Sequence, residues 1–207
     1  MIIVIDYDAG NTANVLRALA AIGAEARLSA NPKEILAADG LILPGVGAFR
    51  TAMQELQKRD LIGPIQEAVS GGKPFLGICL GMQLLLEVGL ENGQTSGLGF
   101  IPGVCRRIPD RAGLPVPHMG WNDLQIQQPS ALTNRLQGEA VYFVHSYYTD
   151  VDQEYLDATA DYGFPVPAMI HKGSVFGCQF HPEKSGQVGL EILRNFKEYV
   201  YEDSTSD

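Results

Sequence analysis

The first half of the chain alternates short, wholly apolar runs with stretches in which apolar residues recur every three or four positions. The apolar runs predict buried strands at residues 2–5, 40–43 and 75–78, and residues 26–28 are expected to form a further short strand. The periodic stretches predict one helix capped by Asn11 or Thr12 and two more at about residues 49–57 and 61–69. Because strands that are apolar on both faces are typical of parallel sheets covered by helices, this half predicts an α/β fold.

The second half has a different pattern. Between residues 99 and 179 the apolar runs are short, turn residues are frequent and helical periodicity is nearly absent. The best strand candidates are residues 141–144, 155–160 and 175–180, and a last helix is expected at about residues 188–201. No linker rich in Pro, Gly or Ser divides the chain, so we expect one domain over residues 1–201 and a frayed, acidic tail over residues 202–207.

Composition narrows the class of protein. The chain has 207 residues, of which 45% are hydrophobic and 19% are charged, which is typical of a compact soluble domain. Its net charge is −9 and no basic run interrupts the acidic balance, so nucleic acid and anionic membranes are not expected partners. We expect a cytosolic protein, because no signal peptide or long apolar run is present. Three cysteines without a C-x-x-C pair predict neither a disulfide framework nor a structural zinc site.

The carboxyl ends of the predicted strands are where an open α/β sheet binds its ligands. One such end carries Gly77, Cys79 and Gly81, with the spacing of a nucleophile elbow in which Cys replaces Ser. Glycine permits the cramped turn, and a thiol at a helix N-terminus loses its proton more easily. The alternative is a buried core cysteine beside packing glycines.

A thiolate nucleophile needs a base and a group that orients the base. His181 follows the strand candidate at residues 175–180, and Glu183 stands two residues further on, where it can hold the imidazole in the useful tautomer. A surface turn is the alternative for this segment. His118 and His145 are candidate binding residues, and His171 is interpreted as a solvated loop residue.

An acyl-transfer site also needs hydrogen-bond donors for the oxyanion. The glycine-rich loop at residues 44–47 follows a neighbouring strand, and its backbone N–H groups and that of Leu80 are candidate donors. An ordinary strand-to-helix turn would have the same glycine content.

The chain resembles the class I glutamine amidotransferase family over almost its whole length, and two motifs carry this resemblance. The pattern G-x-C-x-G-x-Q is matched by Gly77, Cys79, Gly81 and Gln83, and F-H-P-E by residues 180–183. The resemblance implies a single-domain fold with a central, mostly parallel sheet flanked by helices and an added antiparallel β region in the second half. It also implies hydrolysis of glutamine through a thioester at Cys79, with His181 as acid and base and Glu183 as its orienter. The residues that the resemblance assigns to the oxyanion and to glutamine are Val46, Leu80, Gly47, Gln83, Ser146 and Tyr147. No metal or organic cofactor is expected, because thiolate and imidazole suffice for the amide step.

Further segments resemble one branch of that family, the glutaminase subunits of imidazole glycerol phosphate synthases in histidine biosynthesis. They are residues 6–11 with Asn14, 44–49, 117–122 and 142–147. Asp8 departs from the pattern, which often has glycine there. The resemblance implies a heterodimer with a (β/α)₈-barrel cyclase that receives the ammonia. The residues expected at that interface are Asn11, Asn14, His118, Met119, Trp121, Asn122 and Lys184.

Three alternatives remain at this point. The chain could be the small amidotransferase subunit of another synthase, of the anthranilate or pyridoxal phosphate type, although these would not share residues 117–122. It could also be an inactive binding domain of the same fold. For two single residues the plainer interpretations are a core anchor for Trp121 and a solvated side chain for Lys184.

Overall fold

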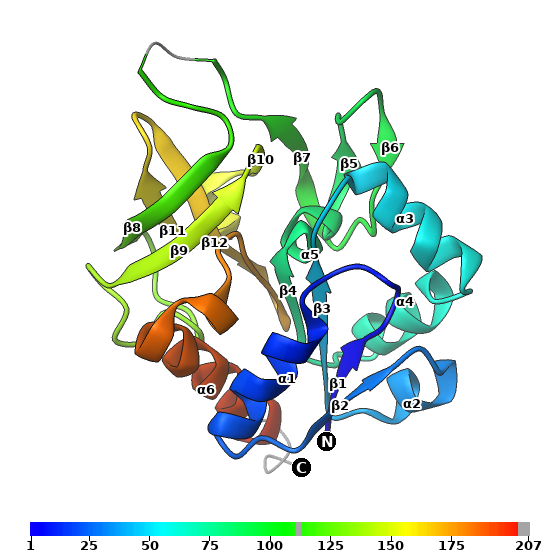
Figure 1. The fold of residues 1–207 in the computed structure, drawn as a ribbon. Coiled ribbons are helices and arrows are strands. Elements are labelled where there is room, and N and C mark those ends of the chain that lie inside the picture. Colours follow the sequence, from blue (N-terminus) through cyan, green and yellow to red (C-terminus); the bar gives the residue numbers. More distant parts are fainter. Residues whose placement is uncertain (111–112, 203–207) are drawn as a thin grey trace.

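A nine-stranded sheet forms the centre of the molecule in the computed structural model, which describes residues 1–110 and 113–202 (Figure 1). Its strand order is β2-β1-β3-β4-β13-β12-β11-β8-β9. The parallel part consists of β1 (Ile2–Ile5), β2 (Ala26–Ser29), β3 (Gly40–Gly45), β4 (Phe75–Cys79) and β13 (Val175–Cys178). The antiparallel part consists of β12 (Pro165–Lys172), β11 (Leu156–Asp161), β8 (His118–Ile126) and β9 (Ala140–His145). The expected α/β fold with a parallel centre and an antiparallel extension is confirmed.

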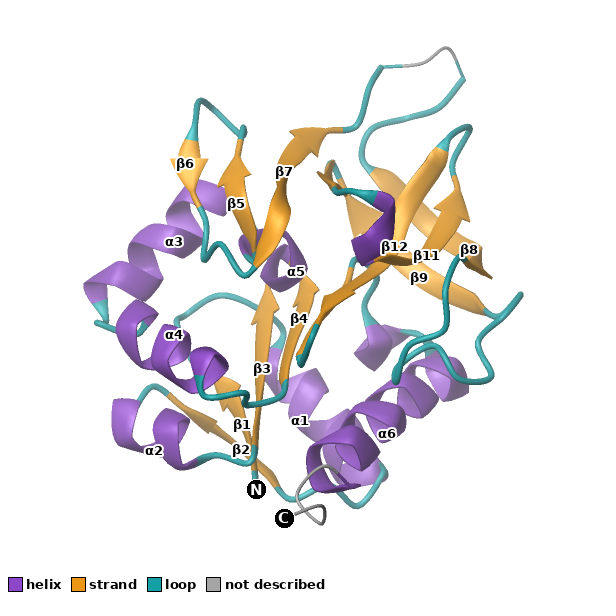
Figure 2. Ribbon diagram, turned by 180° about the vertical axis from the view of Figure 1, so that it is seen from behind, coloured by secondary structure: helices purple, strands orange, loops and turns teal. Residues whose placement is uncertain are grey.

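Helices cover both faces of the parallel part because its strands β1, β3, β4 and β13 are buried along their whole length. Ile2 and Val4 of β1 pack in one core cluster with α1 (Thr12–Ala21) and α6 (Gly186–Glu202). Ile3 and Ile5 pack in a second cluster on the opposite face. The helices on that second face are α2 (Pro32–Ala37), α3 (Phe49–Lys58) and α4 (Ile62–Ser70). Figure 2 shows this layered arrangement from behind.

A smaller, four-stranded sheet lies beside the large one, with the order β10-β7-β5-β6. Its strands are β5 (Leu86–Gly89), β6 (Thr95–Ser96), β7 (Ile101–Arg107) and β10 (Tyr147–Asp150). The chain passes directly from β9 of the large sheet to β10 of the small one, because β9 ends at His145 and β10 begins at Tyr147. Ser146 therefore stands where the backbone passes from one sheet to the other.

Three short helices complete the described structure: α5 (Leu80–Leu84), η1 (Gln153–Tyr155) and η2 (Pro182–Lys184). Both α5 and η2 begin where strands of the parallel part have ended, at the carboxyl edge of the sheet. No helix within residues 1–110 and 113–202 is long and apolar enough to cross a membrane.

Several local predictions differ from the structure. Asn11 occupies the N-cap position of α1, but its side chain makes no capping hydrogen bond. The interpretation of His171 as a loop residue was wrong, because it lies in β12 and its Nδ1 is 2.5 Å from Oδ1 of the buried Asp157. Trp121 is 57% exposed, which excludes the core-anchor interpretation. Helix α6 includes Glu202, and the rest of the expected tail lies outside the described residues.

Candidate active site

Cys79 lies in a strained turn between β4 and α5. Its φ is +55° and its ψ is −110°, a conformation that costs a residue with a side chain about 1–3 kcal/mol. Glycine makes the turn possible: a Cβ on Gly81 would lie 1.8 Å from the carbonyl oxygen of Leu43, and one on Gly77 would lie 2.6 Å from that of Gly81. The motif glycines therefore allow β3, β4 and α5 to pack closely around the cysteine.

His181 and Glu183 follow the strand next to Cys79. Strands β13 and β4 are parallel, with Cys178 opposite Ile78, so the segments beyond their ends meet at the same edge of the sheet. Nδ1 of His181 lies 2.8 Å from Oε1 of Glu183, and both side chains are almost fully buried. An Nδ1–H that donates to this carboxylate leaves Nε2 available to Cys79.

The charges around His181 favour its protonated form. Burial by itself would lower the pKa of His181, but its hydrogen bonds to Cys79 and Glu183 outweigh burial and raise that pKa to about 9. A thiol, a basic imidazole and an orienting carboxylate therefore stand in one chain of contacts. This is the set of groups that nucleophilic attack on an acyl carbon requires.

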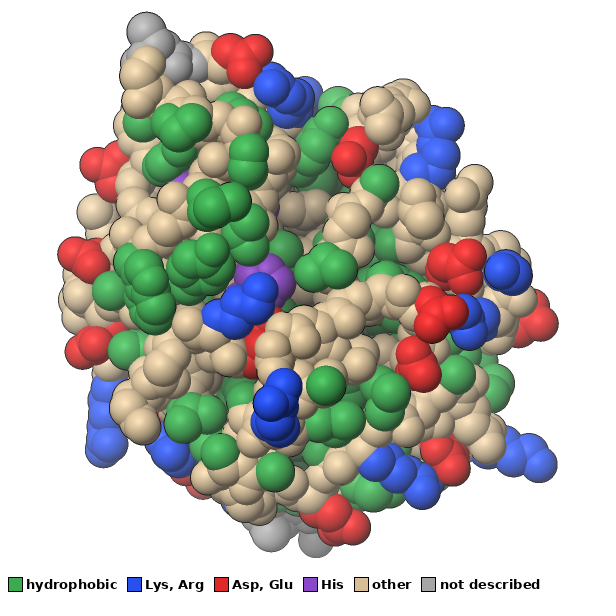
Figure 3. Space-filling view, in the orientation of Figure 1, with side chains coloured by type: hydrophobic (Ala, Val, Ile, Leu, Met, Phe, Trp, Pro, Cys, Tyr) green, Lys and Arg blue, Asp and Glu red, His purple; other side chains and the backbone are tan. Residues whose placement is uncertain are grey.

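A hollow of about 330 Å³ opens over Cys79 and His181. The expected oxyanion and glutamine residues all line it: Val46, Gly47, Leu80, Gln83, Ser146 and Tyr147. They come from the loop after β3, from α5 and from the crossing between β9 and β10. Figure 3 shows a histidine at the centre of this face, with a cationic side chain beside it. The structure thus brings together residues that lie far apart in the sequence.

The end of β3, from which the glycine-rich loop continues, packs directly on the start of α5. A Cβ on Gly45 would lie 2.9 Å from the Cβ of Leu80 and 2.6 Å from the hydroxyl oxygen of Tyr7. That hydroxyl donates to the carbonyl oxygen of Pro44 at 2.7 Å, and burial raises the pKa of Tyr7. Gly47 has a φ of +99°, which favours glycine at this turn. The two stretches that carry the candidate oxyanion donors are therefore held side by side.

Gln179 is a residue of the site that sequence reasoning missed. It is fully buried, and its Nε2 lies 3.8 Å from Sγ of Cys79. Its Oε1 accepts a hydrogen bond from Nε2 of Gln83 at 3.1 Å. The available signal was a glutamine inside the otherwise apolar run at residues 175–180.

The other histidines near the site form a buried pair. Nδ1 of His145 lies 2.8 Å from the carbonyl oxygen of Tyr147, and its Nε2 lies 2.9 Å from Nδ1 of His118. Burial lowers the pKa of His145 to about 3 and also lowers that of His118. His118 was expected at a partner surface, but its side chain is fully buried because it faces inward on β8. The pair supports the crossing between the two sheets.

The remaining expected interface residues have exposed or partly exposed side chains. Met119 and Trp121 alternate with His118 along β8 and are 59% and 57% exposed. Lys184 is exposed at the rim of the hollow. Asn11, Asn14 and Asn122 are partly exposed, and α1 packs beside η2. Hydrophobic side chains gather on the same face, to the left of the histidine in Figure 3.

Asp8 has a φ of +63°, a left-handed conformation that favours glycine. Nη2 of Arg59 donates to its Oδ2 at 2.6 Å. The unusual residue at this position is thus held by an ion pair from the end of α3.

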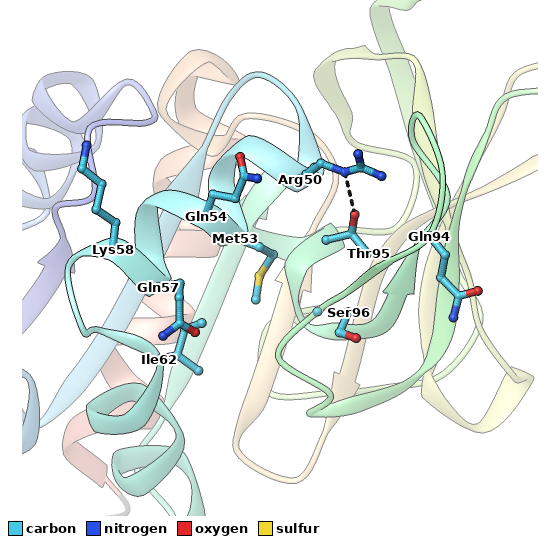
Figure 4. A pocket seen from close by; sticks show the side chains of 10 residues that line it. Arg50, Met53, Gln54, Gln57, Lys58, Ile62, Gln94, Thr95 and Ser96 are labelled. Carbon is cyan, nitrogen blue, oxygen red and sulfur yellow. Dashed lines mark hydrogen bonds between the residues drawn. The ribbon is translucent and has the colours of Figure 1, made fainter.

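A wider groove of about 700 Å³ lies between α3 and the loop that leads into β6 (Figure 4). Figure 4 shows Arg50 over this groove, where its Nε donates to Oγ1 of Thr95 at 3.2 Å. None of the expected catalytic, glutamine or interface residues lines it. Within residues 1–110 and 113–202, no three His, Cys, Asp or Glu side chains gather as a metal ion requires.

Comparison with known proteins identifies the family. Residues 3–199 match the family "Glutamine amidotransferase class-I". The chain is 80% identical over 204 residues to "Imidazole glycerol phosphate synthase subunit HisH" of Streptococcus sanguinis, with 99% of each chain covered. It is 54% identical to the protein of the same name from Listeria monocytogenes serovar 1/2a, with 97% of each chain covered.

Solved structures share the fold at low sequence identity. A putative component of GMP synthase from Thermoplasma acidophilum has a TM-score of 0.73 at 19% identity, over 100% of this chain and 97% of that one. PurLQS from Thermotoga maritima has a TM-score of 0.74 at 19% identity, over 96% of this chain and 98% of that one.

Proposed function

Because this chain belongs to the class I glutamine amidotransferase family, we propose that it is the glutaminase subunit of an imidazole glycerol phosphate synthase. It hydrolyses L-glutamine to glutamate and ammonia and supplies the ammonia to a partner subunit in histidine biosynthesis. The observation that carries the proposal is the chain of contacts Cys79–His181–Glu183 at the base of the hollow. The names of relatives that are 80% identical over nearly the whole chain support the assignment to this synthase.

The geometry supports a thioester mechanism. Nε2 of His181 takes the proton from Cys79 while Nδ1 stays bonded to Glu183. The thiolate attacks the side-chain amide carbon of glutamine, and the carbonyl oxygen becomes an oxyanion facing the backbone N–H groups of Val46 and Leu80. The carbon–nitrogen bond breaks as His181 returns the proton, and ammonia leaves. Water, deprotonated by His181, then hydrolyses the thioester to glutamate and restores the thiol.

Free ammonia is a poor product to release into water, because it is largely protonated there and ammonium is not a nucleophile. Direct transfer to a docked partner avoids this loss, and the partner that the resemblance to this branch of the family implies is a cyclase with a (β/α)₈ barrel, docked over the hollow. Met119 and Trp121 provide exposed apolar surface on β8, where Met119 is paired with Val144 of the hollow's lining, and Lys184 provides a charge at the rim of the hollow. We place the complex in the cytosol, since all three cysteines are free thiols and the nucleophile must stay reduced.

The experiment that tests the function replaces the nucleophile. Cys79→Ala should abolish glutamate release, measured with the cyclase present, while the far-ultraviolet circular dichroism stays that of the parent. The complex should still form imidazole glycerol phosphate and aminoimidazole carboxamide ribotide when an ammonium salt replaces glutamine, because the synthase site is elsewhere. Glutaminase activity that persists in Cys79→Ala, or loss of ammonia-dependent synthesis, would overturn the proposal. An inactive binding domain predicts no glutamate release from the parent complex either.

A second measurement tests the docking surface. Adding the cyclase with its nucleotide ligand should accelerate glutamine hydrolysis at least about tenfold, which is roughly 1.4 kcal/mol of barrier. Lys184→Ala should lower that acceleration or weaken the complex in a titration followed by calorimetry. Lys33→Ala, at an exposed lysine of α2, is the matched control and should change neither. Full activity of the isolated chain, unchanged by the cyclase, contradicts this part of the proposal.

A further inference from the structure

The buried amide of Gln179 joins the nucleophile to the crossing between the two sheets. Nε2 of Gln83 donates to the carbonyl oxygen of Tyr147 at 3.0 Å and to Oε1 of Gln179 at 3.1 Å. Nε2 of Gln179 then lies 3.8 Å from Sγ of Cys79. Gln179 is fully buried and Gln83 is 6% exposed, so water does not compete for these contacts.

The donor-to-acceptor direction of this series of hydrogen bonds is set at one end by a group that can only accept, the backbone carbonyl of Tyr147. A backbone carbonyl only accepts hydrogen bonds, so Gln83 must direct its NH₂ group toward Tyr147. The second hydrogen of the same NH₂ group points to Gln179, so the carbonyl oxygen of the Gln179 side chain must accept this hydrogen bond. The NH₂ group of Gln179 is therefore directed at the sulfur, whereas an isolated amide could be placed either way round.

A donor at this position acts differently on the two forms of the cysteine. The thiol can donate its own proton to the carbonyl oxygen of Val144, which lies 3.9 Å from Sγ. The thiolate has no proton to donate and gains instead from any N–H group that points at it. Gln179 therefore favours the thiolate, while the carbonyl group of Val144 favours the thiol.

We propose that Gln179 is a positioning residue for the nucleophile: its amide N–H holds Sγ of Cys79 as a thiolate, oriented toward the bound amide. This inference rests on the proposed glutaminase function and assigns a role to a residue outside the Cys79–His181–Glu183 set. The backbone keeps Gln179 in place, because its N–H donates to the carbonyl oxygen of Ala168 at 2.9 Å. The carbonyl group of Tyr147, which accepts the hydrogen bond from Gln83, is also within hydrogen-bonding distance of Nδ1 of His145.

Other ionisable groups face Cys79 and are left intact by a change at Gln179. Those close to it or around the hollow are His181, Glu183, His145, Glu91, Lys184, Tyr147 and Tyr7. The thiols of Cys105 and Cys178 are buried, and burial raises the pKa of each. A comparison of variants that differ only at residue 179 therefore isolates the amide.

The test follows the alkylation of Cys79 by iodoacetamide as a function of pH in the full chain, with the rate of Cys79→Ala subtracted as background. Gln179→Met keeps the length of the side chain and removes both the donor to Sγ of Cys79 and the acceptor for Gln83, whereas a second variant, Gln179→Glu, keeps an acceptor for Gln83. The alkylation profile of Gln179→Met should be shifted to higher pH by about one unit, because the hydrogen bond that an N–H group donates to an ionised acceptor stabilises the ionised form by an amount of that order. In the complex with the cyclase, kcat for glutamine should fall about tenfold while KM changes less than threefold. Gln66→Met, at an exposed position on α4, is the matched control and should shift neither quantity.

Gln179→Glu keeps the shape of the side chain, so it still tests the inference if Gln179→Met fails to fold. A carboxylate beside the sulfur should move the alkylation profile upward by more than Gln179→Met does. A purely structural role would lower the melting temperature but leave the profile where it is. An unshifted profile in a folded variant overturns the inference. Failure of the proposed function is recognised separately, as absence of glutaminase activity in the parent complex.

Discussion

Replacing Glu183 by glutamine tests whether a carboxylate is needed behind His181. Oε1 of Glu183 lies 2.8 Å from Nδ1 of His181, and the carboxylate side chain is 1% exposed. A glutamine keeps an oxygen that can accept the Nδ1–H bond, but it removes the negative charge. The hydrogen bond survives in neutral form, so the variant should be impaired rather than inactive.

The size of the effect follows from these contacts. A hydrogen bond to a charged group contributes about 1.5–3 kcal/mol, against about 1 kcal/mol for a neutral one. The loss of about 0.5–2 kcal/mol from the imidazolium that forms in the reaction corresponds to a fall in kcat of roughly two- to thirtyfold. Glu183 also contributes to the raised pKa of His181, so that pKa should move from about 9 toward its ordinary value of 6.5.

The assay measures glutamate release by the complex of the chain with its cyclase, over a range of pH. Ammonia-dependent synthesis serves as the control and should be unchanged, and His181→Ala should be about as inactive as Cys79→Ala, because such groups act as a unit. If Glu183→Gln is as inactive as Cys79→Ala, then Glu183 does more than orient and charge the imidazole. Full activity in Glu183→Gln would show that another group orients His181.

Two further predictions concern stability. Gly81→Ala should lower the free energy of unfolding in urea by several kcal/mol, because its Cβ would lie 1.8 Å from the carbonyl oxygen of Leu43 and would prevent the close packing of α5. Gly63→Ala has open space around its Cβ and should be neutral or stabilising. The hydrogen bond to Asp157 raises the pKa of His171 above 6.5, so its contribution to stability is complete below about pH 6.5 and is lost as the pH rises through the raised pKa. His171→Gln should therefore reduce the pH dependence of the unfolding free energy in that window, and an unchanged dependence would contradict the assignment.

Local pattern was sufficient to predict the parallel part of the fold. Strands β1, β3 and β4 are continuous apolar runs, and they are apolar because two separate cores press on their two faces. The glycines around Cys79 were also visible in the sequence, since a turn with a φ of +55° and a backbone contact on either side requires glycine at fixed spacing. Short-range steric rules act within a few residues, and the sequence displays them directly.

The second half was harder to predict because its elements are held by partners that are distant in the sequence. Strands β7, β8, β10 and β12 were not predicted, and β10 pairs with β7 from a separate part of the chain. In the first half, strands β5 and β6 were also not predicted, and helix α2 was missed because it has only six residues, too few to show a period.

The sequence by itself determined the fold class and identified Cys79, His181 and Glu183 as candidates, because short motifs carry the turn geometry and the reactive groups. Only the tertiary structure decided which other polar groups reach that cysteine. It buried His118 among the strands, left Trp121 exposed, and directed the amide of Gln179 at the sulfur. The direction of that amide depends on Gln83 and on a carbonyl group in another sheet. Such contacts arise only when strands distant in sequence are packed together, so no local pattern records them.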